Sequence, residues 1–187
     1  MKFLQALALQ ALLVQPLLAA DADLANHPGY VDFSSLAAIT GAEPNVEVSL
    51  KEPLLNLITN IIRNQDAQAA GFISKLLRVE VRVFENSSMD RDRVAASMAE
   101  IATDLDAQQW ERVVRVRDDE EHVDVYFRLS SDASLIHGIA VMVAEPREAV
   151  IINIVGDISP DDIAALAARF EIDELSELDY SDDNTDQ

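Results

Sequence analysis

The stretch Leu77-Arg78-Val79-Glu80-Val81-Arg82-Val83 decides the fold class of this chain. Every odd-numbered position in it is aliphatic, and every even-numbered position is charged. This period of two is typical of a β-strand that buries one face and leaves the other face in water. Asn86-Ser87-Ser88 ends the strand, and an amphipathic helical pattern begins near Asp90.

Further strands are predicted after this helix. They span residues 110–117, 122–129, 135–143 and 149–155. Their connections are too short for the crossovers that parallel strands need, so these strands must be antiparallel. The last two are almost continuously apolar, as expected for central strands that are covered on both faces.

Two more segments precede the deciding stretch, and one follows the last strand. Alternation over Val46–Leu50 predicts a strand, and an apolar stripe predicts a helix whose inward residues are Leu54, Leu57, Ile58, Ile61 and Ile62. Residues 64–70 are expected to be a loop or a frayed helix end. Ser159-Pro160-Asp161-Asp162 is a strong helix start, with a hydroxyl N-cap, a proline and two carboxylates.

The predicted order is therefore β-α-β-α-β-β-β-β-α. It indicates an α+β fold with a single, mainly antiparallel sheet and helices packed on one face. We expect an N-terminal entry segment at residues 23–44, the α+β domain at 45–171, and an acidic flexible tail at 172–187.

Residues 1–22 are typical of a secretory signal peptide, with Lys2 before an apolar stretch and small residues at Ala20 and Ala22 for cleavage after either one. A signal is favoured over an N-terminal membrane anchor because the apolar run is short for a spanning helix. No later stretch is apolar over about 18 residues without charge, so no membrane span is expected after signal removal. A periplasmic or secreted location follows.

Composition excludes several classes of function. Asp and Glu number 34 against 14 Lys and Arg, a formal net charge of -20, so nucleic acids and anionic membrane surfaces are poor partners. The absence of cysteine excludes disulfides, thiolate metal sites and cysteine nucleophiles. The chain contains no nucleophile elbow, phosphate-binding loop or dinucleotide fingerprint, and we predict no catalytic residue and no cofactor.

Arginines on the predicted strands are the candidate binding residues. They are Arg78, Arg82, Arg115, Arg117 and Arg128. Most share the polar parity of their strands, so together they could form a positive patch for a carboxylate or an acidic partner segment. Ordinary cross-strand pairing with Glu80, Glu111 and Asp124 is the favoured alternative, because such pairs are common on sheet surfaces.

The three histidines give no strong signal. His27 lies in a turn, and His137 lies in an apolar strand where a structural role is expected. His122 and Asp124 could both face a metal ion, but one imidazole and one carboxylate are not specific, so no metal site is predicted.

Several segments together resemble an exported bacterial family, the domain of unknown function 4252. They are Gly29-Tyr30-Val31-Asp32-Phe33, Val46–Leu50 with Leu54-Leu55, Leu77–Val83, and Ile151–Ile158 leading into Asp162–Leu166. The likeness runs from about Tyr30 to Phe170. Many members look like lipoproteins with a cysteine after the signal, so the lack of one here implies a soluble periplasmic protein. The family has no established activity. Some members are encoded near extracytoplasmic sigma-factor regulators, and the resemblance therefore implies a link to envelope-stress signalling.

We therefore expect a non-enzymatic domain that binds a protein partner or a small component of the cell envelope, through its sheet face or an edge strand. One alternative is a small periplasmic enzyme, which predicts a concave pocket with His122 or His137 beside a carboxylate. Another is a self-associating structural envelope protein, which predicts an apolar surface patch. The oligomeric state stays open.

Overall fold

The computed structural model describes residues 24–34, 43–85, 91–118 and 121–169. The predicted signal peptide at 1–22 and the acidic tail at 172–187 lie outside these residues. The elements, in chain order, are β1 (Val46–Lys51), α3 (Glu52–Ile62), α4 (Ala67–Ile73), β2 (Leu76–Glu85), α5 (Arg91–Ala107), β3 (Glu111–Arg117), β4 (His122–Leu129), β5 (Ile136–Ala144), β6 (Glu148–Ile158) and α6 (Pro160–Arg169). No helix among the described residues is both long and apolar enough to cross a membrane.

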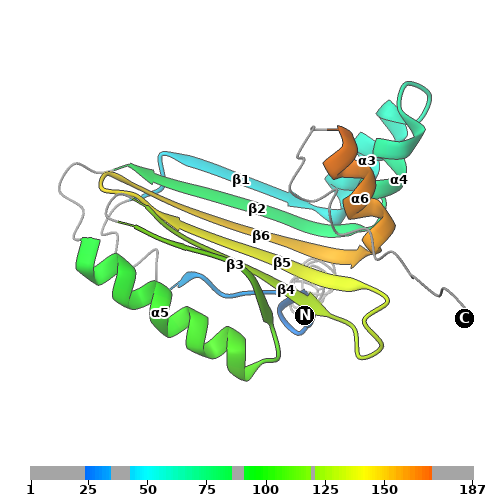
Figure 1. The fold of residues 1–187 in the computed structure, drawn as a ribbon. Coiled ribbons are helices and arrows are strands. Elements are labelled where there is room, and N and C mark those ends of the chain that lie inside the picture. The colour runs from blue at the N-terminus through cyan, green and yellow to red at the C-terminus, as the bar shows by residue number, and fades with distance from the viewer. Residues whose placement is uncertain (1–23, 35–42, 86–90, 119–120, 170–187) are drawn as a thin grey trace, which may run out of the picture.

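The strands form one antiparallel six-stranded sheet in the order β1-β2-β6-β5-β4-β3 (Figure 1). The predicted α+β class and the antiparallel sheet are thus confirmed. The element order also matches the prediction, except that α4 occupies part of the segment expected to be a loop. Asp66 begins this helix, because its side chain accepts a hydrogen bond from the Ala69 N–H at 2.9 Å.

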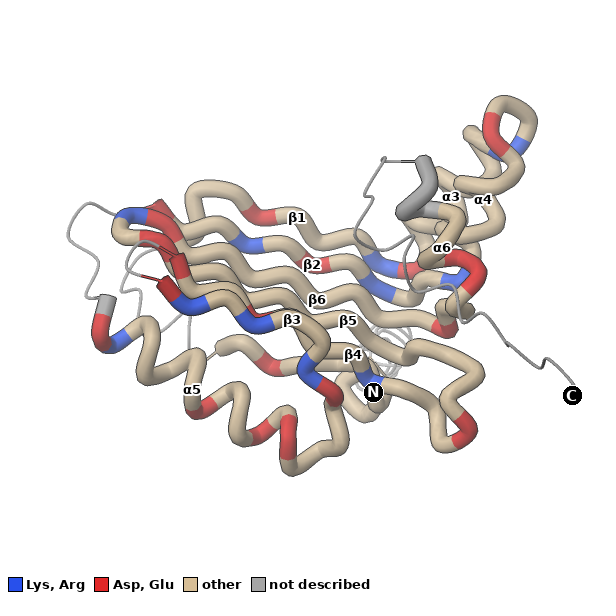
Figure 2. The backbone as a smooth tube through the Cα atoms, viewed as in Figure 1, with Lys and Arg blue, Asp and Glu red and all other residues tan. Residues whose placement is uncertain are grey.

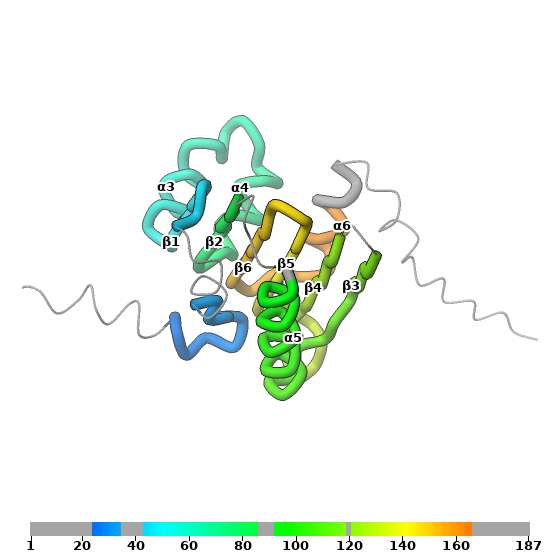
Figure 3. The backbone as a smooth tube through the Cα atoms, turned by 90° about the vertical axis from the view of Figure 1, so that its left-hand side faces the viewer, coloured from blue at the N-terminus to red at the C-terminus, as the bar shows by residue number. Residues whose placement is uncertain are grey.

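Helix α5 packs on one face of the sheet, named the covered face below (Figures 1 and 3). Val94, Met98 and Leu105 of this helix form one buried cluster with Tyr126 of β4 and Met142 of β5. The N-terminal segment, residues 24–34, lies on the same side and contributes Val31 and Phe33 to this cluster.

Helices α3, α4 and α6 gather at one end of the opposite face (Figure 1). Leu55 of α3, Leu76 of β2 and Ile158 of β6 are buried in a second core there. The expectation that helices pack on one face is therefore wrong in this respect. Both sets of strand side chains contain large apolar residues, and helices pack against both faces.

Helix α6 begins as its sequence predicts. The Ser159 hydroxyl caps the helix by accepting from the Asp162 N–H at 3.4 Å, and the Asp162 carboxylate accepts from the Ser159 N–H at 2.9 Å. This reciprocal pair is a capping box, which satisfies two backbone donors at the start of the helix.

Asn153 in the middle of β6 fastens the N-terminal segment to the sheet. Its side chain is buried, accepts a hydrogen bond from the Val31 N–H at 3.1 Å, and donates to the carbonyls of Gly29 at 3.0 Å and Ile139 at 3.2 Å. One side-chain amide therefore satisfies backbone groups of both the N-terminal segment and the neighbouring strand β5.

Replacing this residue, Asn153→Ala, should lower the free energy of unfolding by about 2–3 kcal/mol, because buried backbone groups of Gly29 and Val31 lose their partner. Urea denaturation measures this change. Asn56→Ala, at an exposed position on α3, is the matched control and should change stability by less than about 0.5 kcal/mol. Equal effects of the two substitutions would show that the Asn153 contacts do not hold the segment.

Candidate functional site

The two faces of the sheet are used in the opposite way from that expected for the stretch Leu77–Val83. Its polar side chains point to the covered face, where Glu80 is 8% exposed. On β4, Asp124 and Tyr126 point to the same face and are fully buried. The aliphatic residues that alternate with them point to the other face. The expectation of a wet polar face is therefore wrong, because α5 and the N-terminal segment cover that face and its charges neutralise one another.

The structure separates the candidate arginines into two groups. Arg78 and Arg82 lie on β2, whereas Arg115 and Arg117 lie on β3 and Arg128 on β4. Strands β6, β5 and β4 lie between β2 and β3. At about 4.8 Å per strand, β2 and β3 are roughly 19 Å apart. The arginines therefore do not converge into one positive patch.

The arginines on β2 pair with acidic residues of the same sheet. Arg78 contacts Glu80 and lies over the Tyr30 ring, 5.6 Å from its centroid. Arg82 is 2.6 Å from the Glu80 carboxylate and 3.4 Å from that of Glu47. Glu80 therefore neutralises both arginines from within the same strand, whereas Arg82 and Glu47 pair across β1 and β2.

The second group surrounds a buried carboxylate. Arg117 forms an ion pair with Asp124, and Arg115 Nε lies 3.8 Å from the other Asp124 oxygen. Arg128 donates to the Gln109 carbonyl at 3.2 Å, where the chain has a positive φ of 65° between α5 and β3. These contacts give each arginine a structural role, and their role in binding stays a prediction.

Beside these charges, Arg112 of β3 donates a hydrogen bond to the Tyr126 hydroxyl at 3.0 Å. Burial raises the pKa of Tyr126, and the bond to Arg112 opposes this shift. The buried hydroxyl of Tyr126 therefore has a hydrogen-bond partner within the covered face.

The opposite face carries two unbroken aliphatic rows, one residue from each strand. From β1 to β3, the first row is Val48, Val81, Ile152, Val141, Val125 and Val114. The second row is Val46, Val83, Val150, Val143, Val123 and Val116. The next row, which includes Leu50, Val79 and Ile154, packs against α3, α4 and α6. The two rows are named the open face below.

The rim residues of the open face are well exposed for aliphatic side chains. Val46 of β1 is 47% exposed and Val114 of β3 is 43% exposed, while the central residues are half-buried by their neighbours. The α3 stripe also differs from its prediction, because Leu54, Leu57 and Ile61 are exposed whereas Leu55 and Thr59 point inward.

An acidic hollow lies at the end of the sheet formed by the β3–β4 and β5–β6 hairpins. It has a volume of about 510 Å³ and is lined by Asp118, Glu121, Glu145, Pro146 and Arg147. Charged residues gather around these two hairpins in Figure 2. Val116 and Val123 precede and follow one hairpin, and Val143 and Val150 flank the other, so the hollow lies at the same end of the sheet as the second aliphatic row.

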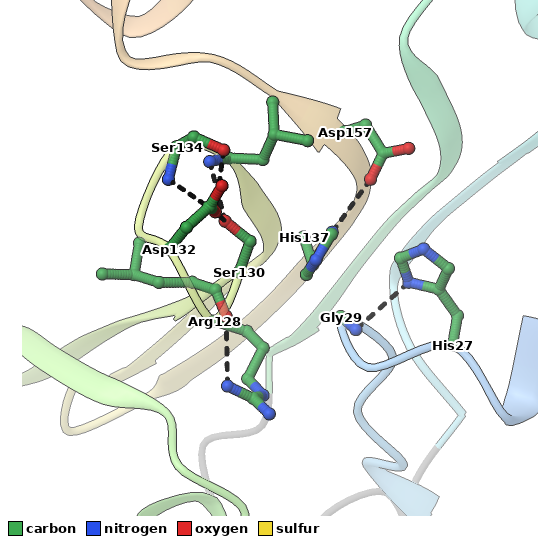
Figure 4. Close-up of polar contacts among 10 residues, drawn as sticks. His27, Gly29, Arg128, Ser130, Asp132, Ser134, His137 and Asp157 are labelled. Carbon is green, nitrogen blue, oxygen red and sulfur yellow. Dashed lines mark hydrogen bonds and ion pairs between the residues drawn. The ribbon is translucent and has the colours of Figure 1, made fainter.

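A cluster of polar side chains lies at the other end of the sheet (Figure 4). His137 Nδ1 is 2.9 Å from the Asp157 carboxylate, and the rings of His27 and His137 lie edge to face with centroids 5.8 Å apart. Burial lowers the pKa of His27; the Asp157 carboxylate opposes this shift, and His137 adds to it. Spacing cannot reveal such a cluster, because its members lie far apart in the chain.

The substitution Arg117→Met should cost about 3 kcal/mol of stability, because it leaves the buried Asp124 carboxylate with only the more distant Arg115. Urea denaturation at neutral pH measures the cost. Arg147→Met, at an exposed position of the β5–β6 turn, removes the same charge as a control. If both variants lose the same small amount, the Arg117–Asp124 pair does not support the covered face.

Comparison with known proteins agrees with the resemblance found in the sequence. A family model described as Domain of unknown function (DUF4252) matches residues 41–166, which is more than half of the chain. Curated proteins and solved structures gave no match. The chain belongs to the DUF4252 family.

Proposed function

We propose that this protein is a non-enzymatic, exported binding domain that holds an apolar segment of another envelope protein on its open face. The observation that carries this proposal is the double aliphatic row across all six strands, which α3, α4 and α6 leave uncovered. The largest apolar patch on a monomeric soluble protein is often a functional surface.

The size of the open face favours a segment of a partner over a large partner surface. Six strands and two side-chain rows give roughly 400 Å² from the standard strand spacing and rise. A stable interface between folded proteins needs about 800 Å² from each partner. The open face is half of this, which suits an amphipathic helix or strand laid across the sheet.

Charge favours a partner with basic residues beside its apolar part. The strand residues of the open face are uncharged, but the hollow at the hairpin end of the sheet is lined by three carboxylates, Asp118, Glu121 and Glu145, against one arginine, Arg147. The whole chain has a net charge of -20. Two copies meeting through this face would bring like charges together, whereas a basic segment gains attraction and faster association.

Export and location are part of the same proposal. The signal-like residues 1–22 support delivery to the periplasm, where a partner in the cell envelope would meet the open face. The gene neighbourhoods of the resembling family support a role in envelope-stress signalling.

A small enzyme is the second candidate function, and one observation favours it. His137 lies beside the carboxylate of Asp157, which is the arrangement that orients an imidazole as a general base. The binding proposal ranks first because the open face spans the whole sheet, whereas a His–carboxylate pair also occurs as a structural contact.

Photo-crosslinking in cells tests the proposal. A benzoylphenylalanine at position 116, on the open face, should crosslink to a different protein, and one at position 103, exposed on α5, should not. Adding Val48→Asp should cut the yield of the crosslink about tenfold. Burying the new carboxylate under the partner weakens the binding free energy by more than about 1.4 kcal/mol, which is a tenfold loss of affinity. The crosslinked peptide should be apolar with basic residues beside it.

Three outcomes would contradict this proposal. Crosslinks only to a second copy of the chain would favour self-association instead. Equal yields at positions 103 and 116 would mean that the open face is not a specific surface. An unchanged yield with Val48→Asp, in a variant whose thermal melting matches that of the parent, would place the contact elsewhere.

Sedimentation velocity of the purified protein gives an independent check. The small area of the open face and the net charge of -20 predict a monomer over a wide range of concentrations at moderate salt. A concentration-dependent dimer that Val48→Asp abolishes would support the self-associating alternative.

A further inference from the structure

We propose that His27, His137 and Asp157 form a binding site for a divalent transition-metal ion of the Zn²⁺ type. One ligand atom from each residue lies within 4.8 Å of the others. Two imidazoles and one carboxylate are a recurrent zinc ligand set, which leaves a fourth position for water. This site goes beyond the proposed binding function, because neither the open face nor the acidic hollow takes part in it.

The fold brings these three residues together from distant parts of the chain. His27 comes from the N-terminal segment, His137 from the start of β5 and Asp157 from the end of β6. The β5–β6 register shifts between Ile136 and Gly138, so both strands are irregular at this point. Irregularities of this kind turn side chains away from the regular alternation and are common beside functional sites.

Close backbone contact holds His27 beside His137. A Cβ atom at Gly29 would lie 1.8 Å from the His137 carbonyl oxygen, and one at Gly138 would lie 2.5 Å from Gly29. Only glycine permits this approach. Asn153 also bonds the Gly29 carbonyl, so the turn that carries His27 is fixed on the sheet.

Metal binding replaces the hydrogen bonds of the cluster. His137 Nδ1 lies 2.9 Å from the Asp157 carboxylate oxygen, and a metal ion that binds both atoms takes the place of the proton between them. The His27 Nδ1 accepts from the Gly29 N–H at 3.1 Å. A ligating imidazole is protonated on its other nitrogen, so His27 gives up this one hydrogen bond when it binds a metal.

The side chains need only a small adjustment to reach coordination distances. Zinc bound to nitrogen at about 2.0–2.1 Å places tetrahedral ligand atoms roughly 3.3 Å apart. Asp157 is 60% exposed, so its side chain can rotate toward the histidines. Imidazole ligands favour zinc, copper or nickel, whereas calcium and magnesium prefer sites made of oxygen.

Calorimetric titration with Zn²⁺ alone tests this site in protein produced from the full sequence and freed of metal with a chelator. We expect saturable binding of one ion per chain. His27→Ala and His137→Ala should each weaken it by at least about tenfold, the effect that even an outer-shell change produces. His122→Ala, which removes a histidine outside the cluster, should leave the affinity unchanged.

Thermal melting supplies a second readout. Zn²⁺ should raise the melting temperature of the parent protein and of His122→Ala, because a ligand that binds only the folded state stabilises it. It should not raise that of His27→Ala. His137→Gln serves in place of His137→Ala if the alanine variant melts early without metal.

Three results would overturn the proposal. The first is the absence of saturable Zn²⁺ binding to the parent protein. The second is binding that persists unchanged in His27→Ala, which would place the ion outside this cluster. The third is displacement of Zn²⁺ by excess Ca²⁺, which would assign the ion to oxygen ligands on the acidic surface.

Discussion

Side chains on neighbouring residues of a strand point to opposite faces of a sheet, and in this protein the polar set is the one that α5 and the N-terminal segment cover. Burying Asp124, Glu80 and Asn153 is tolerable only because each has partners within the layer. Arg117 neutralises Asp124, the β2 arginines share Glu80, and Asn153 bonds backbone from both layers. A buried charge without these contacts would cost several kcal/mol. The rest of the molecule depends on this satisfied polar layer.

Two consequences for function follow from it. The aliphatic set must face the other way, where three helices cover one end of the sheet and leave two rows of Val and Ile uncovered. The N-terminal segment, held by Asn153, brings His27 to the irregular ends of β5 and β6. The open face and the histidine cluster therefore lie at different places and suit different ligands. An apolar, basic segment fits the first, and a transition-metal ion fits the second.

Much of the architecture could be predicted because its signals are local. The alternation in Leu77–Val83 predicts β2, the short connections predict antiparallel pairing, and Ser159 predicts the start of α6. Which face a strand buries is not a local property, because it depends on the element that packs there. The alternation in Leu77–Val83 alone predicts a buried aliphatic face and a solvated charged face, whereas the structure covers the charged face. The His27–His137–Asp157 cluster was missed for the same reason, since it exists only once the N-terminal turn lies on β5.

The central claim is that the polar side chains of the strands are buried on the covered face, and that two rows of aliphatic side chains on the opposite face are open to solvent. Solution NMR of protein with labelled Val and Ile methyl groups, in the presence of a soluble paramagnetic agent, tests this claim most directly. The account predicts strong relaxation for the methyl groups of Val48, Val114 and Val116, and protection for those of Ile151 and Val155 in the covered layer. Protection of the open-face methyl groups in the isolated protein would contradict it, because something other than a partner would then cover that face.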